Sequence, residues 1–466
     1  MIRARMGFAY PFDSARCAHS PDRLAARAAA HPIGAPPAAA RRPGFTSRAQ
    51  GSRRPMDQGT FPRSDSTLSL LLHGYAWLPD QRRRRPGPVL RTRLLGRPAV
   101  VLHGPEAVRF FYDERHIRRA GALPEPVLGT LFGQGAVHGL DGPEHQLRKA
   151  MFLGLLADPG RRGRLVEDVG AAWDAAVPAW RDRGRVVVLD AAAEVLAAGV
   201  ARWAGLTLHD DEMAPLARDL VAMVDGFSTP GPRHWRARLA RRRRERSLAE
   251  LVEAVRDDSL RVPAGCAVHV VAAHRDADGE PLPARVAAVE LLNILRPTTA
   301  VCWFTAFTAH ALHRWPEHRG PLAEGDGAFA TAFAQEVRRF YPFAPFVGGK
   351  AAADLVFAGE RIPAGTLVLL DLYGQNHDAD LWGDPYRFRP QRFLDRPADP
   401  QVLIPQGGGD AATGHRCPGE GVVVGLLESL APRLARLDYT VPDQDLGIPL
   451  SRVIARPRSG FVIAPA

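Results

Sequence analysis

The chain has 466 residues, of which 46% are hydrophobic and 24% charged, a composition typical of a globular protein with a large core. Its net charge is +11, but the arginines that carry this charge are mostly scattered and are not interleaved with aromatic residues, which argues against nucleic acid as a partner. The two short arginine runs, residues 82–85 and 241–244, are expected to lie on solvated faces or in loops.

The four cysteines, at positions 17, 266, 302 and 417, have the spacing of neither a zinc site nor a disulfide framework. This usage favours a reducing, cytoplasmic compartment. The sequence has no charged-then-apolar leader and no uninterrupted apolar run of about 18 residues, so we expect neither a signal peptide nor a membrane anchor.

Residues 1–55 are rich in Arg, Ala, Pro and Gly and are predicted to be a disordered extension. Two short strands are expected within 86–103, and a second strand-rich patch within 345–372, with turns at Gly359 and at 363–365. Apolar periodicity predicts helices over residues 105–113, 143–156, 162–182, 190–205, 210–225, 234–257, 284–314 and 328–340, and a closing helix after Cys417. Residues 56–466 are therefore expected to form one large domain, mainly α with a small β lobe.

The segment 413–420 places a single cysteine, Cys417, after a glycine-rich stretch and before an apolar run. Glycines let the backbone pass close beneath a flat group and leave N–H groups pointing at the sulfur. The preceding His415 and Arg416 can meet carboxylates of that group. The pattern predicts heme, iron protoporphyrin IX (heme b), with Cys417 as the metal ligand. A proximal thiolate of this kind favours O–O cleavage.

Glu336 and Arg339 lie three residues apart on a predicted helix and therefore share a face. This spacing alone is a weak signal, because surface ion pairs of the same kind are common. Its place ahead of the Cys417 loop strengthens it. We expect the pair to anchor residues 387–393 and to brace the cysteine side of the site, in a structural role.

Taken in order, these motifs resemble the cytochrome P-450 superfamily: Glu-x-x-Arg, an aromatic-Arg-Pro stretch and a glycine-rich cysteine loop, within a match from about Met56 to the C-terminus. The common form of the loop has a phenylalanine seven residues before the cysteine, where this chain has Asp410 in a longer loop. That departure resembles one branch, the fatty-acid peroxygenases. The resemblance implies the P-450 fold in a single large domain.

The predicted helix over 284–314 carries Arg296 and Pro297 near its middle. Monooxygenases of the superfamily normally have an acid–alcohol pair there, whereas an Arg-Pro pair resembles the peroxygenase signature. A proline should locally break the helix, and an arginine in an apolar helix needs an anionic partner. That partner could be a surface carboxylate or a heme propionate, but the resemblance favours a substrate.

The resemblance implies that Arg296 binds a fatty-acid carboxylate through a bidentate pair, so that Arg296 and Pro297 belong to the catalytic site. The bound carboxylate would take a proton from hydrogen peroxide and return it to the departing oxygen. Anchoring the acid group would also hold the α and β carbons at the reacting centre. No obligatory redox partner would then be required.

Residues 131–142 resemble the loop that covers the distal face of the heme in this branch. The branch has glutamine or histidine at the place of His138, and histidine there resembles olefin-forming decarboxylases and some β-hydroxylating members. His138 could supply a proton or hold water near the reacting oxygen, or it could merely bond a heme or backbone group. Phe132 is expected to pack beside His138 and shape the substrate site, although a plain core aromatic would look no different.

His145 and Lys149 lie four residues apart at the start of the predicted helix over 143–156 and share a face. In the superfamily this helix supplies basic groups to a heme propionate, with Arg148 as an alternative donor here. A solvated basic helix start is the other interpretation of each residue. Cations near the start of a helix oppose its dipole, which favours an anionic partner for them.

The sequence therefore predicts a heme-thiolate fatty-acid peroxygenase that hydroxylates the α or β carbon with hydrogen peroxide, with oxidative decarboxylation to a terminal alkene as a further reaction. Two alternatives remain open at this point. One is a reductase-dependent P-450 monooxygenase, against which the missing acid–alcohol pair argues. The other is a non-catalytic heme-binding protein, against which Arg296 and the distal loop argue.

Overall fold

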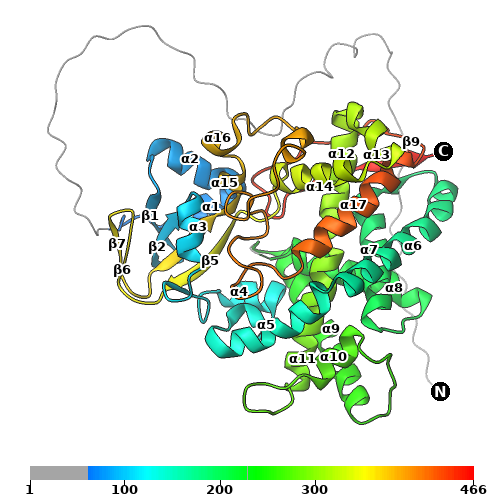
Figure 1. The fold of residues 1–466 in the computed structure, drawn as a ribbon, viewed down its shortest axis with the longest axis horizontal. Helices are drawn as coiled ribbons and strands as arrows, with labels where there is room; N and C mark the ends of the chain where they lie inside the picture. Colours follow the sequence, from blue (N-terminus) through cyan, green and yellow to red (C-terminus); the bar gives the residue numbers. More distant parts are fainter. Residues whose placement is uncertain (1–60, 228) are drawn as a thin grey trace, which may run out of the picture.

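The computed structural model describes residues 61–227 and 229–466. The predicted disordered extension, 1–55, lies outside the described residues, as does the predicted start of the domain at residue 56. The described chain is mainly helical with a smaller β lobe, as predicted (Figure 1). Within it, no helix combines the length and the apolar character needed to cross a membrane.

The β lobe is built on a five-stranded sheet with the strand order β1-β2-β8-β5-β3. Its first two strands form a hairpin, and Leu95 and Gly96 at the turn both have positive φ. The strand-rich patches predicted within 86–103 and 345–372 are confirmed. The strands are β1 (Val89–Leu94), β2 (Arg97–Leu102), β3 (Ile117–Arg118), β4 (Val186–Val187), β5 (Phe346–Ala351), β6 (Leu355–Phe357), β7 (Glu360–Ile362), β8 (Leu367–Asp371), β9 (Tyr439–Thr440) and β10 (Val462–Pro465).

The eight helices predicted from apolar periodicity are all present, with ends shifted by a few residues. They are α3 (Pro105–Phe111), α5 (Gly142–Leu156), α6 (Pro159–Arg183), α7 (Val188–Ala204), α8 (Asp210–Asp225), α9 (Pro232–Arg256), the pair α11 (Ala284–Thr299) and α12 (Val301–Arg314), and α14 (Gly327–Phe340). The closing helix after the cysteine is α17 (Glu420–Arg436). Short helices that periodicity did not single out include α1 (Thr67–His73), α2 (Trp77–Arg84), α4 (Glu125–Val127), α10 (Ala267–Ala273), α13 (Arg319–Glu324), α15 (Leu372–Asn376) and α16 (Ala379–Trp382).

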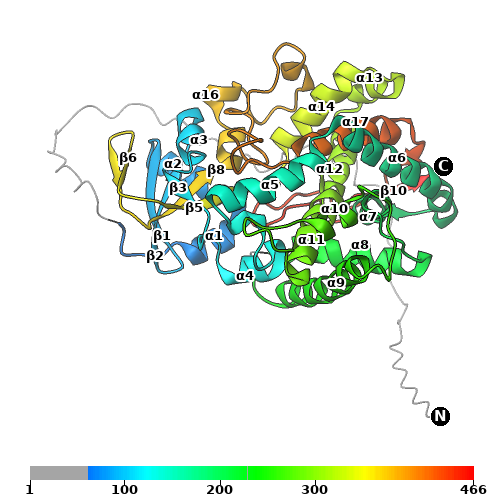
Figure 2. The ribbon, with the colours of Figure 1, turned by 60° about the horizontal axis from the view of Figure 1, so that its bottom comes forward.

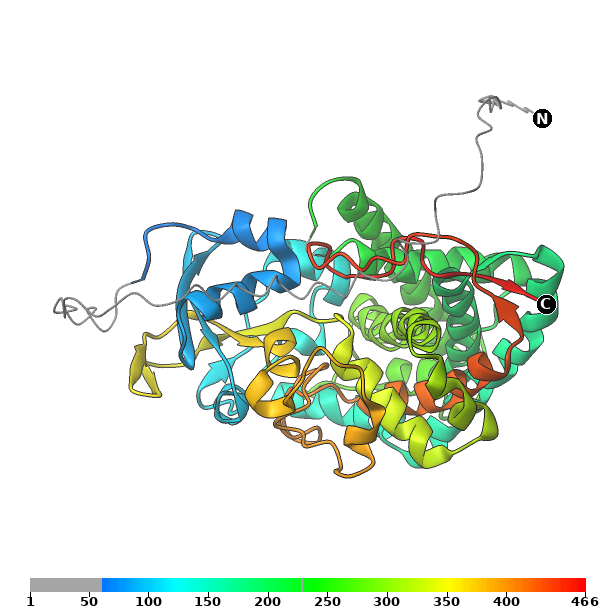
Figure 3. The same cartoon turned by 90° about the horizontal axis from the view of Figure 1, so that it is seen from above.

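Helices α11 and α12 run through the middle of the helical lobe. Seen from above, α12 is viewed almost end-on and is surrounded by other helices (Figure 3). Every residue of α12 from Val301 to Leu312 is buried, which matches a mostly apolar sequence interrupted only by Thr305, Thr308 and His310. The same cluster of apolar side chains joins this segment to α7, α14 and α17, so the central helix is held from several sides.

The predicted interruption of the central helix is present. Pro297 lies inside α11, and the helix ends two residues later at Thr299, before α12 begins at Val301. Proline has no N–H to donate and its ring crowds the preceding turn. Arg296 therefore lies in the last turn of α11, just before the break between the two buried helices.

The two arginine runs are not merely solvated, which corrects that expectation. Arg241 is buried on α9 and pairs with Glu245 at 2.6 Å. Arg244 pairs with Asp219 at 2.8 Å, and Arg82 lies 3.6 Å from the buried Asp371. These carboxylates replace the water that the sequence pattern suggested, because a buried guanidinium needs a charged partner.

His310 of α12 makes the fold sensitive to acid. Its Nδ1 lies 2.8 Å from the Tyr341 hydroxyl, and burial lowers its pKa from 6.5 to about 4. The unfolded chain binds more protons than the folded chain between these values, so the stabilisation is complete above pH 6.5 and is lost as the pH falls towards 4. At pH 5 this single group should cost about 2 kcal/mol relative to pH 7. Urea unfolding of the wild type and of His310→Asn at both pH values measures it, and the variant should lose less stability than the wild type.

Candidate functional site

The loop before α17 presents Cys417 as a partly buried thiol. Gly407 and Gly409 of this loop have positive φ, and a side chain at either position would overlap Tyr112. Burial raises the pKa of the Cys417 thiol, while the backbone N–H of Gly419 points at the sulfur and lowers it. A partly buried thiol with an N–H donor suits a metal ion, whose positive charge offsets the loss of water around the thiolate. Cys417 therefore fits the proximal ligand of a heme.

Glu336 and Arg339 of α14 are fully buried and form a bidentate pair, with both N···O distances at 2.8 Å. The Arg339 guanidinium also donates to the carbonyls of Asn376 and Pro385, and Glu336 accepts from the backbone N–H of Arg389. The pair thus holds the irregular segment that connects α15 with the cysteine loop, which includes part of the predicted 387–393 stretch. Figure 2 shows α14 beside this orange segment.

A second network, which sequence reasoning missed, ties the same helix to the cysteine loop itself. Arg338 is buried next to Arg339, donates to Gln406 at 3.0 Å and pairs with Glu420. Glu420 in turn pairs with Arg416 at 2.6 Å. Arg416, predicted to meet a heme carboxylate, is therefore bonded to the first residue of α17. A charged residue inside the Glu-x-x-Arg motif was the available signal, but its position in the sequence did not indicate Glu420 as its partner.

The basic residues predicted to meet heme carboxylates gather at the start of α5. The rings of His145 and His415 stack with centroids 3.8 Å apart, and Glu114 approaches both, at 3.3 Å from His145 Nδ1 and 3.4 Å from His415 Nε2. Both histidine nitrogens are buried without a hydrogen-bond partner among the described residues. Donors without partners fit an incoming carboxylate such as a heme propionate.

Lys149 and Arg148 of α5 have other partners. The Lys149 ammonium donates to the carbonyls of Gly414 and Arg416 at 2.5 and 2.6 Å, so it supports the cysteine loop from the other side. Burial lowers its pKa from 10.5 to about 8. Arg148 pairs with Glu290 through Nη1 and with Asp276 through Nη2, while its buried Nε has no partner among the described residues.

Burial also lowers the histidine pKa values, with nearby cations adding to the effect. The pKa of His145 falls to about 4, with Lys149 as a neighbouring charge, and that of His415 to about 2, with Arg119 as the first such charge. Both rings are thus neutral near pH 7. A neutral imidazole still donates one N–H to a carboxylate.

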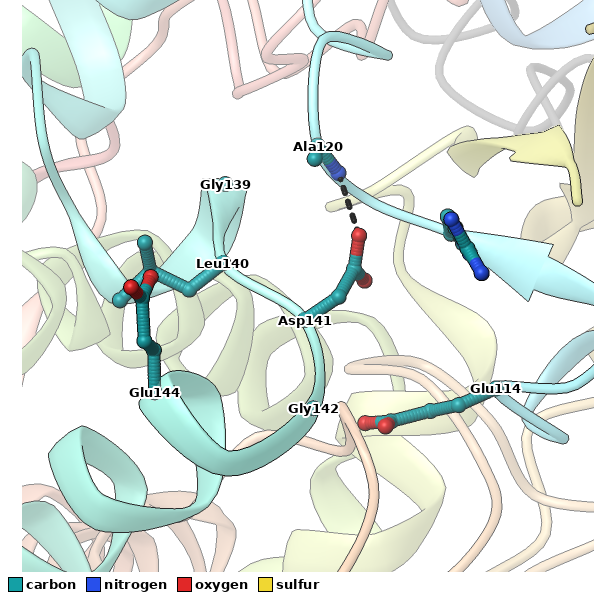
Figure 4. A pocket seen from close by; sticks show the side chains of 8 residues that line it. Glu114, Ala120, Gly139, Leu140, Asp141, Gly142 and Glu144 are labelled. Atoms are coloured by element: carbon teal, nitrogen blue, oxygen red, sulfur yellow. Dashed lines mark hydrogen bonds between the residues drawn. The ribbon is translucent and has the colours of Figure 1, made fainter. Parts of the chain in front are cut away.

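A cavity of about 440 Å³ lies beside this cluster (Figure 4). It is bordered by the chain around Gly139 to Gly142 at the start of α5, by Glu144 and by Glu114. The Asp141 carboxylate fixes one wall by accepting from the backbone N–H of Ala120 at 2.9 Å. Neither Arg296 nor Cys417 lines this cavity.

Arg296 is a buried residue in the last turn of α11. Its residue exposure is 4%, and its Nη1 has no hydrogen-bond partner within the described part of the chain. Burial lowers the pKa of Arg296 well below its usual value, and the charge of Arg241 lowers it further. Glu290 acts in the other direction, but its carboxylate is already bonded to Arg148 and Asn293. A desolvated guanidinium with a free N–H is a strong binding site for a carboxylate.

The loop residues predicted for this site lie beside Arg296. The Arg296 guanidinium is 5.8 Å from the centroid of the Phe132 ring, and Phe132 packs against His138 with ring centroids 4.3 Å apart. Burial lowers the pKa of His138 from 6.5 to about 3, and its Nδ1 has no partner among the described residues. The structure thus brings Arg296, Phe132 and His138 together. Two buried polar atoms of this group, Arg296 Nη1 and His138 Nδ1, have no hydrogen-bond partner among the described residues.

The family model described as Cytochrome P-450 matches residues 328–422, the stretch that contains Glu336, Arg339 and Cys417. Among curated proteins, the matched stretch spans a third of the length of cytochrome P-450 4A7 of Oryctolagus cuniculus, at 28% identity over 172 residues and 33% of this chain. Abscisic acid 8'-hydroxylase 3 of Oryza sativa subsp. indica matches at 26% identity over 407 residues, 79% of this chain and 77% of that protein.

Solved structures give longer and more similar matches. Cytochrome P-450SP alpha, in complex with (R)-ibuprophen, is 42% identical, covers 86% of this chain and 98% of its own, and superimposes with a TM-score of 0.84. Ligand-free cytochrome P-450 OleT is 37% identical, covers 86% and 96%, and superimposes with a TM-score of 0.83. An OleT variant in complex with arachidonic acid matches equally well. With the Arg-Pro pair of α11 and the long cysteine loop, these matches show that the chain belongs to the cytochrome P-450 family, in its fatty-acid peroxygenase branch.

Proposed function

We propose that this protein is a heme-thiolate peroxygenase that uses hydrogen peroxide to hydroxylate the α or β carbon of a fatty acid. The observation that carries the proposal is Arg296, a buried guanidinium with an N–H that has no partner in the described chain. Burying such a charge is costly unless an anion joins it. A relative of this chain has been solved with arachidonic acid, which is a carboxylic acid of the proposed class.

The cofactor of the family is heme bound through a cysteine thiolate, and heme b is proposed here. Cys417 would hold the iron, His145 and His415 would meet propionates, and Arg416 and Lys149 would fix the loop between them. When bound, a thiolate-ligated heme supplies the oxidising chemistry and favours O–O cleavage. Glu336 and Arg339 keep the cysteine loop in place from α14.

The role of Arg296 is to anchor and to orient. Its planar guanidinium can pair with both carboxylate oxygens at once, which fixes the direction of the acyl chain as well as its end. The α and β carbons lie next to the acid group, so anchoring alone selects them. Pro297 follows the arginine in the last turn of α11, and the Phe132 ring lies over the guanidinium.

The anchored carboxylate would then act as the base and the acid of the reaction. It takes a proton from hydrogen peroxide and returns it to the oxygen that leaves as water. The balance is one fatty acid and one hydrogen peroxide giving one hydroxy acid and one water. Because the substrate carboxylate carries this proton, the protein needs no acidic side chain at position 296. An arginine can therefore occupy that position.

Turnover of palmitate tests the proposal. The heme-loaded protein with palmitate and hydrogen peroxide, and without reductase, should form α- or β-hydroxypalmitate or the corresponding alkene, measured by gas chromatography. A parallel reaction receives NADPH and a reductase instead of peroxide. Turnover confined to the second reaction would identify a reductase-dependent monooxygenase, and turnover in neither would favour a non-catalytic heme protein.

A cytoplasmic location is also proposed, based on the cysteine usage.

His138→Gln should change the product ratio without changing heme content. With a pKa of about 3, His138 is neutral between pH 5 and 8. Its ring then offers one N–H donor and one acceptor nitrogen beside Phe132. Glutamine keeps a donor but cannot relay a proton, so we expect the ratio of alkene to hydroxy acid to move by about tenfold. Gas chromatography measures the ratio and the Soret absorbance measures heme content. An unchanged ratio would limit His138 to packing.

The low pKa of His138 has a second consequence. Protonation of this ring begins only as the pH approaches about 3, so His138 should add no limb to the pH profile of turnover between pH 5 and 8. A limb in that range that disappears in His138→Gln would contradict the assignment.

A further inference from the structure

The loop from Leu131 to Gly139 carries both Phe132 and His138, and its backbone is bonded to two buried ion pairs that come from other helices. The π-helix η2 (Leu128–Phe132) overlaps its first two residues, and the 3-10 helix η3 (Val137–Gly139) closes it. Between them, Gly133 and Gly135 have φ of 91° and 77°. Such a glycine-containing loop has no rigidity of its own, so its conformation depends on what it contacts.

The first ion pair holds the start of the loop. Arg241 of α9 donates through Nη1 to the carbonyl of Leu131 at 2.8 Å and through Nη2 to that of Phe132 at 2.9 Å. Its Nε donates to Glu245 at 2.6 Å. A side chain at Gly133 would overlap the Arg241 guanidinium, so the loop backbone lies directly against it.

The second ion pair holds the end of the loop. Glu290 of α11 is fully buried and accepts from the backbone N–H of Val137 at 2.8 Å, the residue before His138. The same carboxylate oxygen accepts from Arg148 Nη1 at 2.9 Å, and that nitrogen also lies 3.4 Å from the Gly135 carbonyl. Glu290 and Arg296 are on the same helix, so this contact links the loop to the helix that carries the substrate anchor.

Stability alone does not explain these pairs. A buried ion pair costs about as much in lost hydration as it returns, and apolar side chains of similar size often serve stability better. The pairs orient the loop backbone that they contact, because a guanidinium and a carboxylate form good hydrogen bonds in only a few geometries. They bond the loop at both ends, and His138 lies one residue after the second contact.

We propose that the Arg241–Glu245 and Arg148–Glu290 pairs are positioning groups that set where along the acyl chain the bound fatty acid is oxidised. They do so by fixing Phe132 and His138 relative to Arg296. The inference rests on the proposed function, because it concerns the choice among the products of that reaction. It adds residues on α5, α9 and α11 that form no hydrogen bond with the substrate anchor themselves.

The test replaces the first pair in two ways. Arg241→Met combined with Glu245→Leu removes both charges together, so that no unpaired charge stays buried, but it also removes the donors to the Leu131 and Phe132 carbonyls. Arg241→Lys keeps a cation for Glu245 but lacks the fork that reaches two carbonyls. Arg244→Met is the matched control: Arg244 lies on the same helix and pairs with Asp219, which Arg243 also contacts.

Each variant is loaded with heme and supplied with palmitate and hydrogen peroxide, and the α-hydroxy, β-hydroxy and alkene products are separated by gas chromatography. We expect the product ratio to change by about threefold or more in both pair variants and to stay within about 1.5-fold in the control. Palmitate affinity, from the change in the Soret band, should stay within about threefold in all of them, because Arg296 is intact. A variant whose product ratio changes while its palmitate affinity is retained has lost the positioning of the loop and has not lost its structure in general.

An unchanged ratio in a pair variant that binds heme and palmitate normally would overturn the inference while leaving the proposed function in place. A wild-type protein that forms no product from palmitate and peroxide would overturn the proposed function itself. If the double variant fails to bind heme, Arg241→Lys decides by the same criterion. A ratio that shifts as much in Arg244→Met as in the pair variants would also refute the specific role of Arg241.

Discussion

Arg296→Ala is expected to lower kcat/KM for fatty-acid oxidation by peroxide about 10²- to 10³-fold. The guanidinium is desolvated, and Phe132 lies over it, so its pair with a carboxylate would form in a medium of low dielectric constant. Removing one partner of such a pair costs about 2–5 kcal/mol. The loss should appear both in binding and in turnover, because the same carboxylate is proposed to carry the proton.

The same substitution should leave the fold intact or stabilise it. In the protein without substrate, Arg296 is buried with an Nη1 that has no partner in the described chain, a state that costs about 1–3 kcal/mol. Alanine removes that cost, so the midpoint of thermal unfolding should not fall although activity does.

Steady-state kinetics with palmitate, heme content from the Soret band and thermal unfolding together measure these opposite changes. Arg296→Lys serves as the matched variant: it keeps a positive charge but loses the planar fork, and we expect intermediate activity. Normal turnover in Arg296→Ala, or a loss of activity that only follows a loss of heme, would contradict the anchoring role.

Glu336→Gln is expected to destabilise the protein by about 3–5 kcal/mol, the largest effect on stability that we predict. Glu336 is fully buried and neutralises Arg339 at 2.8 Å and Arg392 at 3.1 Å. An amide keeps the shape and some hydrogen bonds but leaves two guanidinium groups without their shared anion. Because the same residues hold the segment leading to the cysteine loop, heme retention should fall together with stability.

Urea unfolding and heme content measure this prediction. Arg361→Gln is a suitable control, since Arg361 forms an exposed pair with Asp354 at 3.8 Å, and exposed pairs contribute about 0–1 kcal/mol. If Glu336→Gln unfolded at the same urea concentration as the wild type and kept its heme, the bracing role would have to be abandoned.

Comparison of these residues shows what kinds of feature could be inferred in advance. The long helices could be predicted from apolar periodicity. A helix buries one face, so its apolar residues recur about every 3.6 positions in the sequence. The hairpin β1–β2 and the patch β5–β8 followed from turn residues between short apolar runs. Arg296 stood out because a charge in the middle of a buried apolar helix needs a partner, whatever that partner is.

The hydrogen-bond and ion-pair partners of the buried basic residues could not be predicted from the sequence. Arg241 belongs to a run of four arginines that looked solvated, yet it bonds carbonyls of a loop more than one hundred positions away along the chain. Arg338 looked like a neighbour of the Glu-x-x-Arg motif, yet it pairs with Glu420 beside the cysteine. Lys149 was predicted to meet a heme carboxylate, and its ammonium also donates to two carbonyls of the cysteine loop, which the sequence did not indicate.

The sequence by itself therefore determined the long helices and the two strand-rich patches, the cysteine in its glycine-rich loop and the presence of an arginine–proline pair in the central helix. These properties depend on residues close together in the chain, where periodicity and backbone preference act directly. Only the tertiary structure decided which carboxylates and carbonyls each buried arginine meets, and hence how the loop of Phe132 and His138 is held beside Arg296. Charge pairing has no fixed spacing, since any carboxylate or carbonyl that the fold brings near can satisfy a guanidinium.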